Sequence, residues 1–179
     1  LILSAGRRVE LVQSFQSAVK RLSPESKVFA ADFNNEMSSA CFVADKSFKV
    51  PKVDSPDYVA YLMQLCVENK ISLLIPTIDT ELQILADSRA IFLDAGINLP
   101  VSDVEFISSC RDKRLTAEVF SILGIDQPRI YEKDNLEFPL FCKPFDGSSS
   151  VGAFPILESD GLTPEVLANP RNMFMELIS

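Results

Sequence analysis

Short apolar runs alternate with longer amphipathic stretches through the first hundred residues of the chain. The apolar runs at residues 1–4, 27–31 and 71–76 predict buried strands. Helices are predicted at residues 12–22, 55–66 and 80–95, where apolar side chains recur at helical spacing. The apolar faces of the first two helices consist of Val12, Phe15, Val19 and Leu22, and of Tyr58, Leu62, Leu65 and Cys66.

Strands that alternate with helices favour a mostly parallel sheet covered by helices, with right-handed crossovers. The fold class is therefore α/β, and residues 1–110 are expected to form a Rossmann-like domain with a short edge strand near residues 98–100. The pattern changes after this point. We place the domain boundary between residues 110 and 111, so that residues 111–179 form part of a second domain.

The second part begins with a predicted helix over residues 111–123, ended by Gly124. Its inward face is expected to contain Leu115, Val119, Phe120 and Leu123. Strands are predicted near residues 130–131, 139–142, 153–157 and 173–178, with the second and third paired antiparallel and a short helix after Thr163 and Pro164. The last of these strands is expected to end without a partner.

The stretch from Phe138 to Gly152 combines a strand, a lysine and a loop of small residues. Small residues let backbone N–H groups converge on an anion, and the ammonium of Lys143 neutralises it as a point charge. The stretch therefore indicates a phosphate site, although an ordinary β-hairpin with a polar turn stays open as the alternative. It differs from a P-loop because its lysine precedes the glycine-rich segment and no helix follows.

The first turn of the chain, residues 4–8, contains one glycine. A dinucleotide-binding fingerprint needs three, so this domain is a poor candidate for NAD. Gly6 and Arg7 lie at the carboxyl edge of the predicted sheet and could hold a substrate anion, but an arginine at the start of a helix is more often simply exposed. Asp32 ends the next strand, where doubly wound sheets often place an acidic residue at a ligand crevice.

Asp79 and Glu81 follow the strand at residues 71–76 and allow two interpretations. They could form an acidic pair on the substrate side or between domains. Alternatively, Asp79 or Thr80 caps the next helix, and an acidic first turn suits the helix dipole. Capping is the interpretation that we favour.

Composition narrows the chemistry that the chain can carry. Its 179 residues are 47% apolar, enough to bury a core, and its net charge of −8 argues against nucleic acid as a partner. The chain has no histidine, and its four cysteines have no C-x-x-C spacing, which argues against a zinc site and excludes a Ser-His or Cys-His hydrolase. Carboxylates, lysines and metal-bound phosphate are the chemistry that is left.

No apolar run approaches the roughly 20 residues needed to span a bilayer, and no leader peptide is evident at the start. The cytoplasm is therefore the expected location, without a membrane partner. The chain opens on Leu1 without an initiator methionine, so we expect it to be a portion of a longer product.

The order of five motifs resembles the ATP-grasp superfamily over essentially the whole chain, with the closest likeness to carbamoyl-phosphate-synthase-like ATP-grasp proteins. In order, these motifs are the turn at residues 4–8, Pro-Thr-Ile-Asp-Thr-Glu-Leu at 76–82, Asp112-Lys113 opening a helix, Cys142-Lys143-Pro144 with the loop to Gly152, and Phe174-Met175-Glu176-Leu177-Ile178.

The resemblance implies a pre-ATP-grasp domain at residues 1–110 and, at residues 111–179, the amino-terminal part of an ATP-grasp domain including its lid subdomain. Such enzymes transfer the γ-phosphoryl group of ATP to a carboxylate, and an amine or similar nucleophile attacks the acyl phosphate. This chemistry suits a site without histidine, because phosphoryl transfer depends mainly on positioning and charge neutralisation.

The resemblance also implies roles for single residues. Lys143 is expected to contact the α- and β-phosphates, Lys113 to contact the nucleotide, and the backbone of Met175 and Ile178 to read the adenine edge beside Glu176. A solvated helix start remains the alternative for Lys113, and core packing the alternative for Met175 and Ile178. The loop expected to fold over the triphosphate contains Gly147, Ser148, Ser149, Ser150, Val151 and Gly152.

The family's Mg²⁺ ligands, a late glutamate and a Glu-x-Asn element, are expected beyond residue 179. We therefore name no metal ligand and no catalytic residue, and we expect this chain alone to be inactive although its parent would be an ATP-dependent ligase. The expected ligands are ATP, Mg²⁺ and a small carboxylate, and a homodimer is allowed. The alternative is a non-catalytic module that binds a nucleotide or metabolite.

Overall fold

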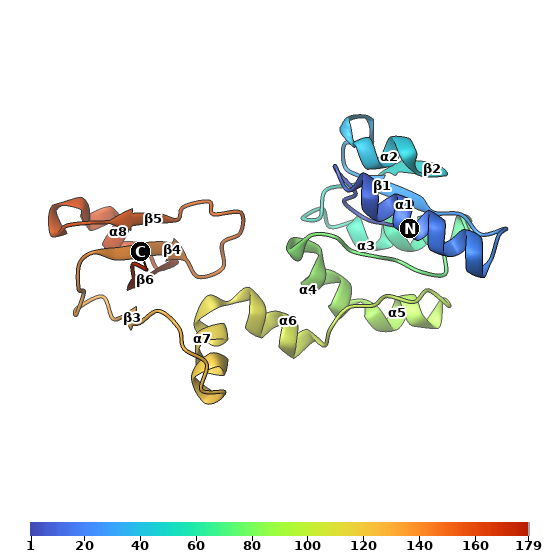
Figure 1. The fold of residues 1–179 in the computed structure, drawn as a ribbon. Helices are drawn as coiled ribbons and strands as arrows, with labels where there is room; N and C mark the ends of the chain where they lie inside the picture. Colours follow the sequence, from blue (N-terminus) through green and yellow to red (C-terminus); the bar gives the residue numbers. More distant parts are fainter. Residues whose placement is uncertain (179) are drawn as a thin grey trace. The chain divides into compact units, whose positions relative to one another are not determined.

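The computed structural model describes residues 1–178. The chain divides into two compact units, Leu1–Val104 and Glu105–Ser179 (Figure 1). The division along the sequence falls at the start of helix α6 (Val104–Arg111).

A parallel sheet forms the centre of the first unit. Strand β1 (Phe29–Asp32) pairs in parallel with β2 (Lys46–Lys49), and single parallel bridges join Ile2 to both Ala30 and Ile75. A further parallel bridge joins Leu73 to Asn98. The α/β fold with a parallel sheet is therefore confirmed, and the predicted strands at residues 1–4 and 71–76 contribute single bridges to it.

Helices supply the apolar residues that cover both faces of this sheet. Successive strand residues point to opposite faces, so Leu1, Leu3 and Ala31 pack in one core cluster while Ile2 and Ala30 pack in another. The first cluster includes side chains of α3 (Tyr58–Glu68) and α5 (Arg89–Asp94), and the second includes side chains of α1 (Val9–Leu22) and α2 (Ser39–Val43). The remaining elements of the unit are a 3₁₀ turn η1 (Asn35–Met37) and helix α4 (Asp79–Asp87).

Two details of the predicted helices are wrong. The helix predicted over residues 80–95 is two helices, α4 and α5, separated at Ser88, whose hydroxyl donates to the Ile84 carbonyl at 2.8 Å. A serine hydroxyl that competes for helix carbonyls favours such a break. Leu22, assigned to the inward face of α1, is 86% exposed because it lies in the last turn of that helix, beyond the buried part.

A four-stranded antiparallel sheet forms the second unit, in the order β3–β6–β4–β5. The predicted pairing of residues 139–142 with 153–157 is confirmed, since Leu140 lies opposite Ile156. The last strand was expected to lack a partner, but β6 pairs with both β3 and β4. The elements are α7 (Lys113–Ile122), β3 (Ile130–Tyr131), β4 (Leu140–Pro144), β5 (Phe154–Ile156), η2 (Ser159–Gly161), α8 (Pro164–Ala168) and β6 (Asn172–Glu176).

One face of this sheet carries the core of the second unit. Leu140, Cys142 and Phe174 are buried there with Ile156, and Val166 of α8 packs against them. Strand alternation therefore places Phe141, Lys143, Met173 and Met175 on the opposite face. This second face is where the candidate site lies.

The predicted inward face of α7 is wrong. Leu115, Val119 and Phe120 are 37–40% exposed, and Leu123 is 65% exposed. Hydrophobic spacing identifies which residues share a face of a helix, but it does not identify what covers that face.

Candidate nucleotide-binding site

Two lysines and a loop of small residues meet in one pocket of the second unit. Strand β4 delivers Lys143 to a pocket of about 220 Å³, and the first residue of α7, Lys113, lies in the same pocket. The remaining lining residues are Phe141, Pro144, Gly147, Ser148, Ser149, Ser150, Val151 and Ala153. Side chains that are distant in sequence are thus brought together where the sequence predicted a phosphate site.

The loop above the lysines has a backbone that restricts its residues. Ser149, Ser150 and Gly152 have φ angles of 53°, 58° and 73°, in the left-handed region that few side chains tolerate. A Cβ atom at Gly147 or Gly152 would lie 3.2 Å from the ring of Pro144. A side chain at either position would crowd Pro144, and the two glycines avoid this contact.

Lys113 is bound to the base of this loop. Its backbone N–H donates to the Phe145 carbonyl at 2.9 Å, and its ammonium donates to the carbonyls of Gly147 at 2.6 Å and Phe145 at 3.3 Å. These bonds do not fit the alternative of a solvated helix-start residue. They leave the Lys113 ammonium directed toward the pocket that Lys143 also lines.

The electrostatics of the pocket favour an anion. Burial lowers the pKa of Lys143 from its ordinary value, and the nearby positive charge of Lys113 lowers it further. Among residues 1–178, no carboxylate forms an ion pair with Lys143. A bound polyanion would neutralise the ammonium groups of Lys113 and Lys143.

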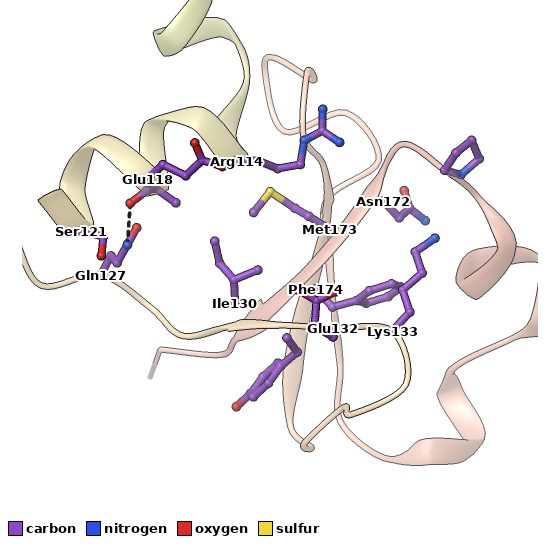
Figure 2. A pocket seen from close by; sticks show the side chains of 13 residues that line it. Arg114, Glu118, Ser121, Gln127, Ile130, Glu132, Lys133, Asn172, Met173 and Phe174 are labelled. Atoms are coloured by element: carbon purple, nitrogen blue, oxygen red, sulfur yellow. Dashed lines mark hydrogen bonds between the residues drawn. The ribbon is translucent and has the colours of Figure 1, made fainter.

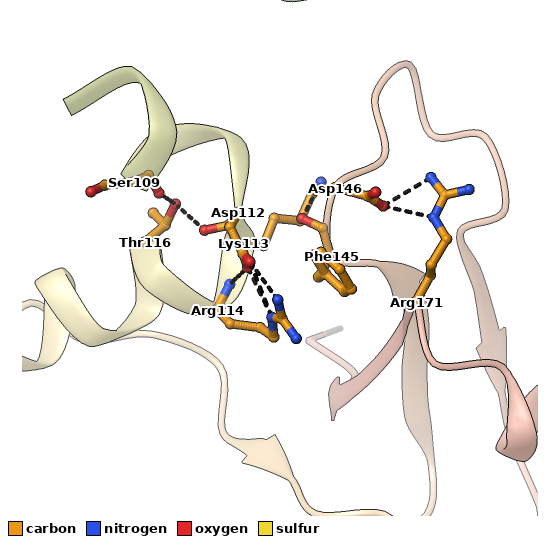
Figure 3. A network of polar contacts seen from close by, with 8 residues as sticks. All are labelled: Ser109, Asp112, Lys113, Arg114, Thr116, Phe145, Asp146 and Arg171. Atoms are coloured by element: carbon orange, nitrogen blue, oxygen red, sulfur yellow. Dashed lines mark hydrogen bonds and ion pairs between the residues drawn. The ribbon is translucent and has the colours of Figure 1, made fainter. Parts of the chain in front are cut away.

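Asp112 and Arg114, which flank Lys113, fix the start of α7. Asp112 caps the helix by accepting from the N–H of Arg114 at 2.9 Å, and it pairs with the Arg114 guanidinium at 2.6 Å. This pairing lowers the pKa of the Asp112 carboxyl. The guanidinium also lies 3.6 Å from the centre of the Phe145 ring, so α7 contacts the loop through Arg114 as well as Lys113 (Figure 3).

Arg171 contacts the other side of the loop base. Its Nε and Nη2 atoms donate to Asp146 Oδ1 at 3.0 and 2.9 Å (Figure 3), which lowers the pKa of the Asp146 carboxyl. Sequence reasoning missed Arg114 and Arg171 as residues of this site. The Asp112-Lys113 helix start was a signal for the first, whereas no local pattern identifies the second.

Strand β6 brings only part of the predicted adenine-reading segment to the lysines. Met175 lines a pocket of about 160 Å³ together with Lys113, Lys143 and Phe120, and its side chain is largely buried. Glu176 accepts from the backbone N–H of Arg129 at 3.2 Å, at the edge toward β3. Ile178 lies beyond the end of β6 and is exposed, so the core-packing alternative fits Met175 and not Ile178.

A larger cleft of about 580 Å³ lies between α7 and the β3–β6 side of the sheet (Figure 2). Its polar side chains are largely engaged within the unit: Lys133 donates to the carbonyls of Leu167 and Asn169, both at 2.8 Å, and Gln127 donates to the carbonyl of Ala117 at 2.8 Å. None of the residues predicted to bind a nucleotide lines this cleft.

The candidate substrate residues of the first unit lie in a tightly bonded turn. Gly6 has a φ angle of 52°, its N–H donates to Asp32 Oδ2 at 2.9 Å, and its carbonyl accepts from the Ser38 hydroxyl at 2.8 Å. Arg7 is exposed. The structure therefore uses Gly6 and Asp32 to fix the turn and leaves the Arg7 side chain at the surface.

Glu81 is fully buried. Its Oε1 atom accepts from the hydroxyls of Ser4 at 2.5 Å and Tyr58 at 2.8 Å, and Oε2 accepts from the N–H of Thr77 at 3.3 Å. Burial, with the negative charge of Glu81 beside it, raises the pKa of Tyr58. Glu81 thus joins three segments of the first unit.

Asp79 is the first residue of α4, and the N-cap is Ile78, which makes no side-chain cap bond. Neither Asp79 nor Thr80 is therefore the N-cap residue of α4. Both Asp79 and Glu81 do lie in the first turn of α4, where negative charge suits the helix dipole.

Within residues 1–178, no group of three or more acidic or cysteine side chains is arranged to hold a metal ion. No helix in this range has the length and apolar character needed to cross a membrane.

The sequence profile of the family described as PylC-like, N-terminal domain matches residues 1–100. No curated protein matches the chain significantly. Among solved structures, similar folds occur in an L-amino acid ligase from Bacillus licheniformis (18% identity, TM-score 0.70) and an N5-carboxyaminoimidazole ribonucleotide synthetase from Thermotoga maritima (16%, 0.63). A third is the biotin carboxylase domain dimer of the Hydrogenobacter thermophilus 2-oxoglutarate carboxylase, in complex with MgADP, ADP and bicarbonate (15%, 0.69).

Each of these comparisons covers 99% of this chain but only 43–45% of the other protein, so the chain spans less than half the length of these structures. At such identities the likeness concerns the fold. The fold is that of the amino-terminal portion of ATP-grasp ligases, which confirms the resemblance stated from the motifs.

Proposed function

Because the chain belongs to the family defined by the PylC-like N-terminal domain, we propose that it is the ATP-binding portion of an ATP-grasp ligase. The whole enzyme would activate a carboxylate as an acyl phosphate, which an amine or similar nucleophile then attacks. A carbamoyl-phosphate-synthase-like specificity is the finer part of this proposal, and it rests on the order of the sequence motifs.

The observation that carries the proposal is the convergence of Lys113, Lys143 and the glycine-serine loop in one pocket of the second unit. Two cations at the base and small residues above them suit a polyphosphate, because loop N–H groups and ammonium groups can bind its oxygens together. Phosphoryl transfer requires this kind of positioning and little covalent participation by protein side chains.

We assign each part of the site a task within this proposal. Lys143 neutralises the α- and β-phosphates from its fixed position on β4, and Lys113 adds a second charge from the start of α7. The residues from Gly147 to Gly152 fold over the triphosphate. The smaller pocket shares both lysines and contains Met175, and we assign the adenine ring to it.

The adenine edge would be read by the main chain at Ile178, beside Glu176. Met175 already pairs with β3 and β4, and the Glu176 N–H donates to the Arg129 carbonyl at 2.8 Å. The family implies Mg²⁺, but residues 1–178 include no fitting ligand group, so no step is assigned to the metal here. A small carboxylate is the proposed acceptor, with Arg7 and Asp79 as its candidate neighbours. Gly6 and Glu81 are bonded within the first unit and are not part of this assignment.

Titration of the full-length protein with MgATP tests the proposal. Lys143→Ala should weaken binding about 10- to 100-fold, because hydrogen bonds to charged groups contribute about 1.5–3 kcal/mol each. Lys133→Ala is the matched control, since Lys133 belongs to the same unit, carries the same charge and bonds only to carbonyls outside the pocket. Unchanged affinity in Lys143→Ala, with an unchanged unfolding temperature, would contradict the nucleotide site and favour a metabolite-binding module.

A further inference from the structure

The loop that follows Lys143 consists of a fixed base and a tip whose backbone bonds, among residues 1–178, stay within residues 148–153. The base, residues 145–147, is bonded to segments on both sides of it. The tip, residues 148–152, has backbone bonds within the loop, from Val151 to Ser148 at 3.1 Å and from Ala153 to Ser150 at 3.2 Å. Two of its serines have left-handed backbone angles, and both are exposed.

Arg171 holds the base from one side through two different groups. Its carbonyl accepts from the N–H of Phe145 at 2.9 Å, and its guanidinium donates twice to the Asp146 carboxylate, at 2.9 and 3.0 Å. Register explains this contact: Pro144 lies opposite Asn172, so the residues after β4 meet the residue before β6. Both side-chain bonds end on the same carboxylate oxygen, so Arg171 holds Asp146 Oδ1 beside the start of β6.

The opposite side of the base is bonded to α7. Lys113 donates to the carbonyls of Phe145 and Gly147, and Arg114 stacks on the Phe145 ring. The Gly147 carbonyl, which orients the Lys113 ammonium at 2.6 Å, directly follows the residue that Arg171 holds. A change in the position of Asp146 would thus change the position of Lys113.

We propose that the ion pair between Asp146 and Arg171 is a positioning element of the nucleotide site. It fixes the base of the loop so that only the tip closes over the phosphates. It also fixes the position of the Gly147 carbonyl, which orients the Lys113 ammonium. The inference rests on the proposed function, because the ligand whose binding it assists is a nucleoside triphosphate. Neither residue touches the ligand in this role; both act through the loop and Lys113.

An ordinary surface ion pair is the competing explanation. The side chains are 40% and 59% exposed, and exposed pairs contribute little to the free energy of unfolding. A positioning role predicts a different result when the pair is removed. The affinity for nucleotide falls, because the loop base must then be ordered during each binding event, while the free energy of unfolding hardly changes.

The test measures MgATP affinity, unfolding temperature and amide hydrogen exchange of residues 145–152 in the full-length protein. Arg171→Gln and Asp146→Asn should each weaken MgATP binding about three- to tenfold, the effect of losing the preorganisation of one or two groups. Exchange at the Asp146 and Gly147 amides should become faster without nucleotide, and the unfolding temperature should stay close to that of the wild type. The double variant should bind no more weakly than either single variant, because both remove the same contact.

Glu137→Gln is the matched control, because it removes the charge from another partly exposed pair in the same unit, Arg129 with Glu137 at 2.8 Å, without touching the loop. Arg171→Lys keeps the charge but loses the two-point geometry, so partial recovery of affinity is expected. Affinity and exchange equal to the wild type in both Arg171→Gln and Asp146→Asn would overturn the inference even if Lys143→Ala abolishes binding. Absence of MgATP binding in the wild type would overturn the proposed function, and the inference with it.

Discussion

The two units each contain a glycine loop after a strand, and the two loops are held in opposite ways. In the first unit, the turn at residues 4–8 is bonded by Glu81, Thr77 and Asp32, and Arg8 adds bonds to the carbonyls of Ser4 and Thr77, both at 3.0 Å. In the second unit, the loop at residues 145–152 is bonded to other segments only at its base, as far as residues 1–178 show.

The groups that hold the two loops also differ in burial. Glu81 is completely buried, whereas Asp146 is 40% exposed. A buried carboxylate that accepts three hydrogen bonds belongs to the core, and its loss leaves polar partners unsatisfied. A partly exposed ion pair contributes little to the free energy of unfolding. The first loop is therefore a fixed part of the scaffold, whereas in the second loop the Asp146 pair holds only the base and leaves residues 148–152 to close over a ligand.

The largest effect that this comparison predicts is on the stability of the first unit. Glu81→Leu should lower the free energy of unfolding by about 3–5 kcal/mol, because it leaves the hydroxyls of Tyr58 and Ser4 without their charged acceptor. Thermal or urea unfolding, followed by amide exchange in residues 1–104, measures this loss.

Tyr58→Phe removes only one of these bonds and should cost about 1–2 kcal/mol. Glu10→Ala, at an exposed position of α1, provides the charge control and should change stability by about 0.5 kcal/mol or less. If Glu81→Leu proved as stable as the control, the turn at residues 4–8 would not be fixed by a buried carboxylate, and the contrast between the loops would fail.

The layers of the fold could be predicted from the sequence because side-chain direction repeats with a fixed period. Val12, Tyr58 and Leu62 are buried as the spacing indicated. The period does not show where the covering layer ends, which is why Leu22 is exposed although it continues the pattern of α1. The helix predicted over residues 80–95 is divided at Ser88, whose hydroxyl bonds to a helix carbonyl. The sequence does not show this bond, because a serine side chain can also point to solvent and leave a helix intact.

The site could be predicted where its signal was local and not where it depended on register. Lys143 and the loop after it are one continuous motif, and the structure places them in one pocket. Arg171 lies 25 residues from Asp146 in sequence, and only the pairing of β4 with β6 brings the two together. Glu81 presented the same difficulty, because its partners Ser4 and Tyr58 are 77 and 23 residues away.

A smaller effect is expected from a methyl group placed against the second loop. Gly152 and Gly124 both have left-handed φ angles, 73° and 67°, so alanine at either position costs about 1–2 kcal/mol of backbone strain. Only at Gly152 would the new methyl meet a neighbour, the Pro144 ring at 3.2 Å; at Gly124 nothing lies within 4 Å. Gly152→Ala should therefore weaken MgATP binding about fivefold, since overpacking by one methyl costs on the order of 1 kcal/mol.

Gly124→Ala should destabilise the second unit to a similar extent but leave MgATP affinity unchanged, which isolates the contact with Pro144 from the backbone strain. Calorimetric titration of both variants with MgATP, beside thermal unfolding, distinguishes the two contributions. Equal loss of affinity in both variants would mean that general destabilisation, and not the seating of the loop, controls nucleotide binding.

The smallest effect that we expect is a dependence of MgATP affinity on pH. It follows from the comparison because Lys113 and Lys143, beside the second loop, are open to a ligand, while the charges at the first loop are paired. Burial and Lys113 lower the pKa of Lys143 below its ordinary 10.5, and a bound phosphate would raise it again, so binding takes up part of a proton. Affinity for MgATP should be constant well below the lowered pKa of Lys143 and should fall as pH rises through that pKa, because the free ammonium then loses its proton before the bound one does. Lys143→Arg, whose guanidinium does not titrate in this range, should lose this dependence, and Lys113→Ala should move it to higher pH by removing the like charge. Identical pH profiles for the wild type and Lys143→Arg would show that the Lys143 ammonium does not bind the nucleotide.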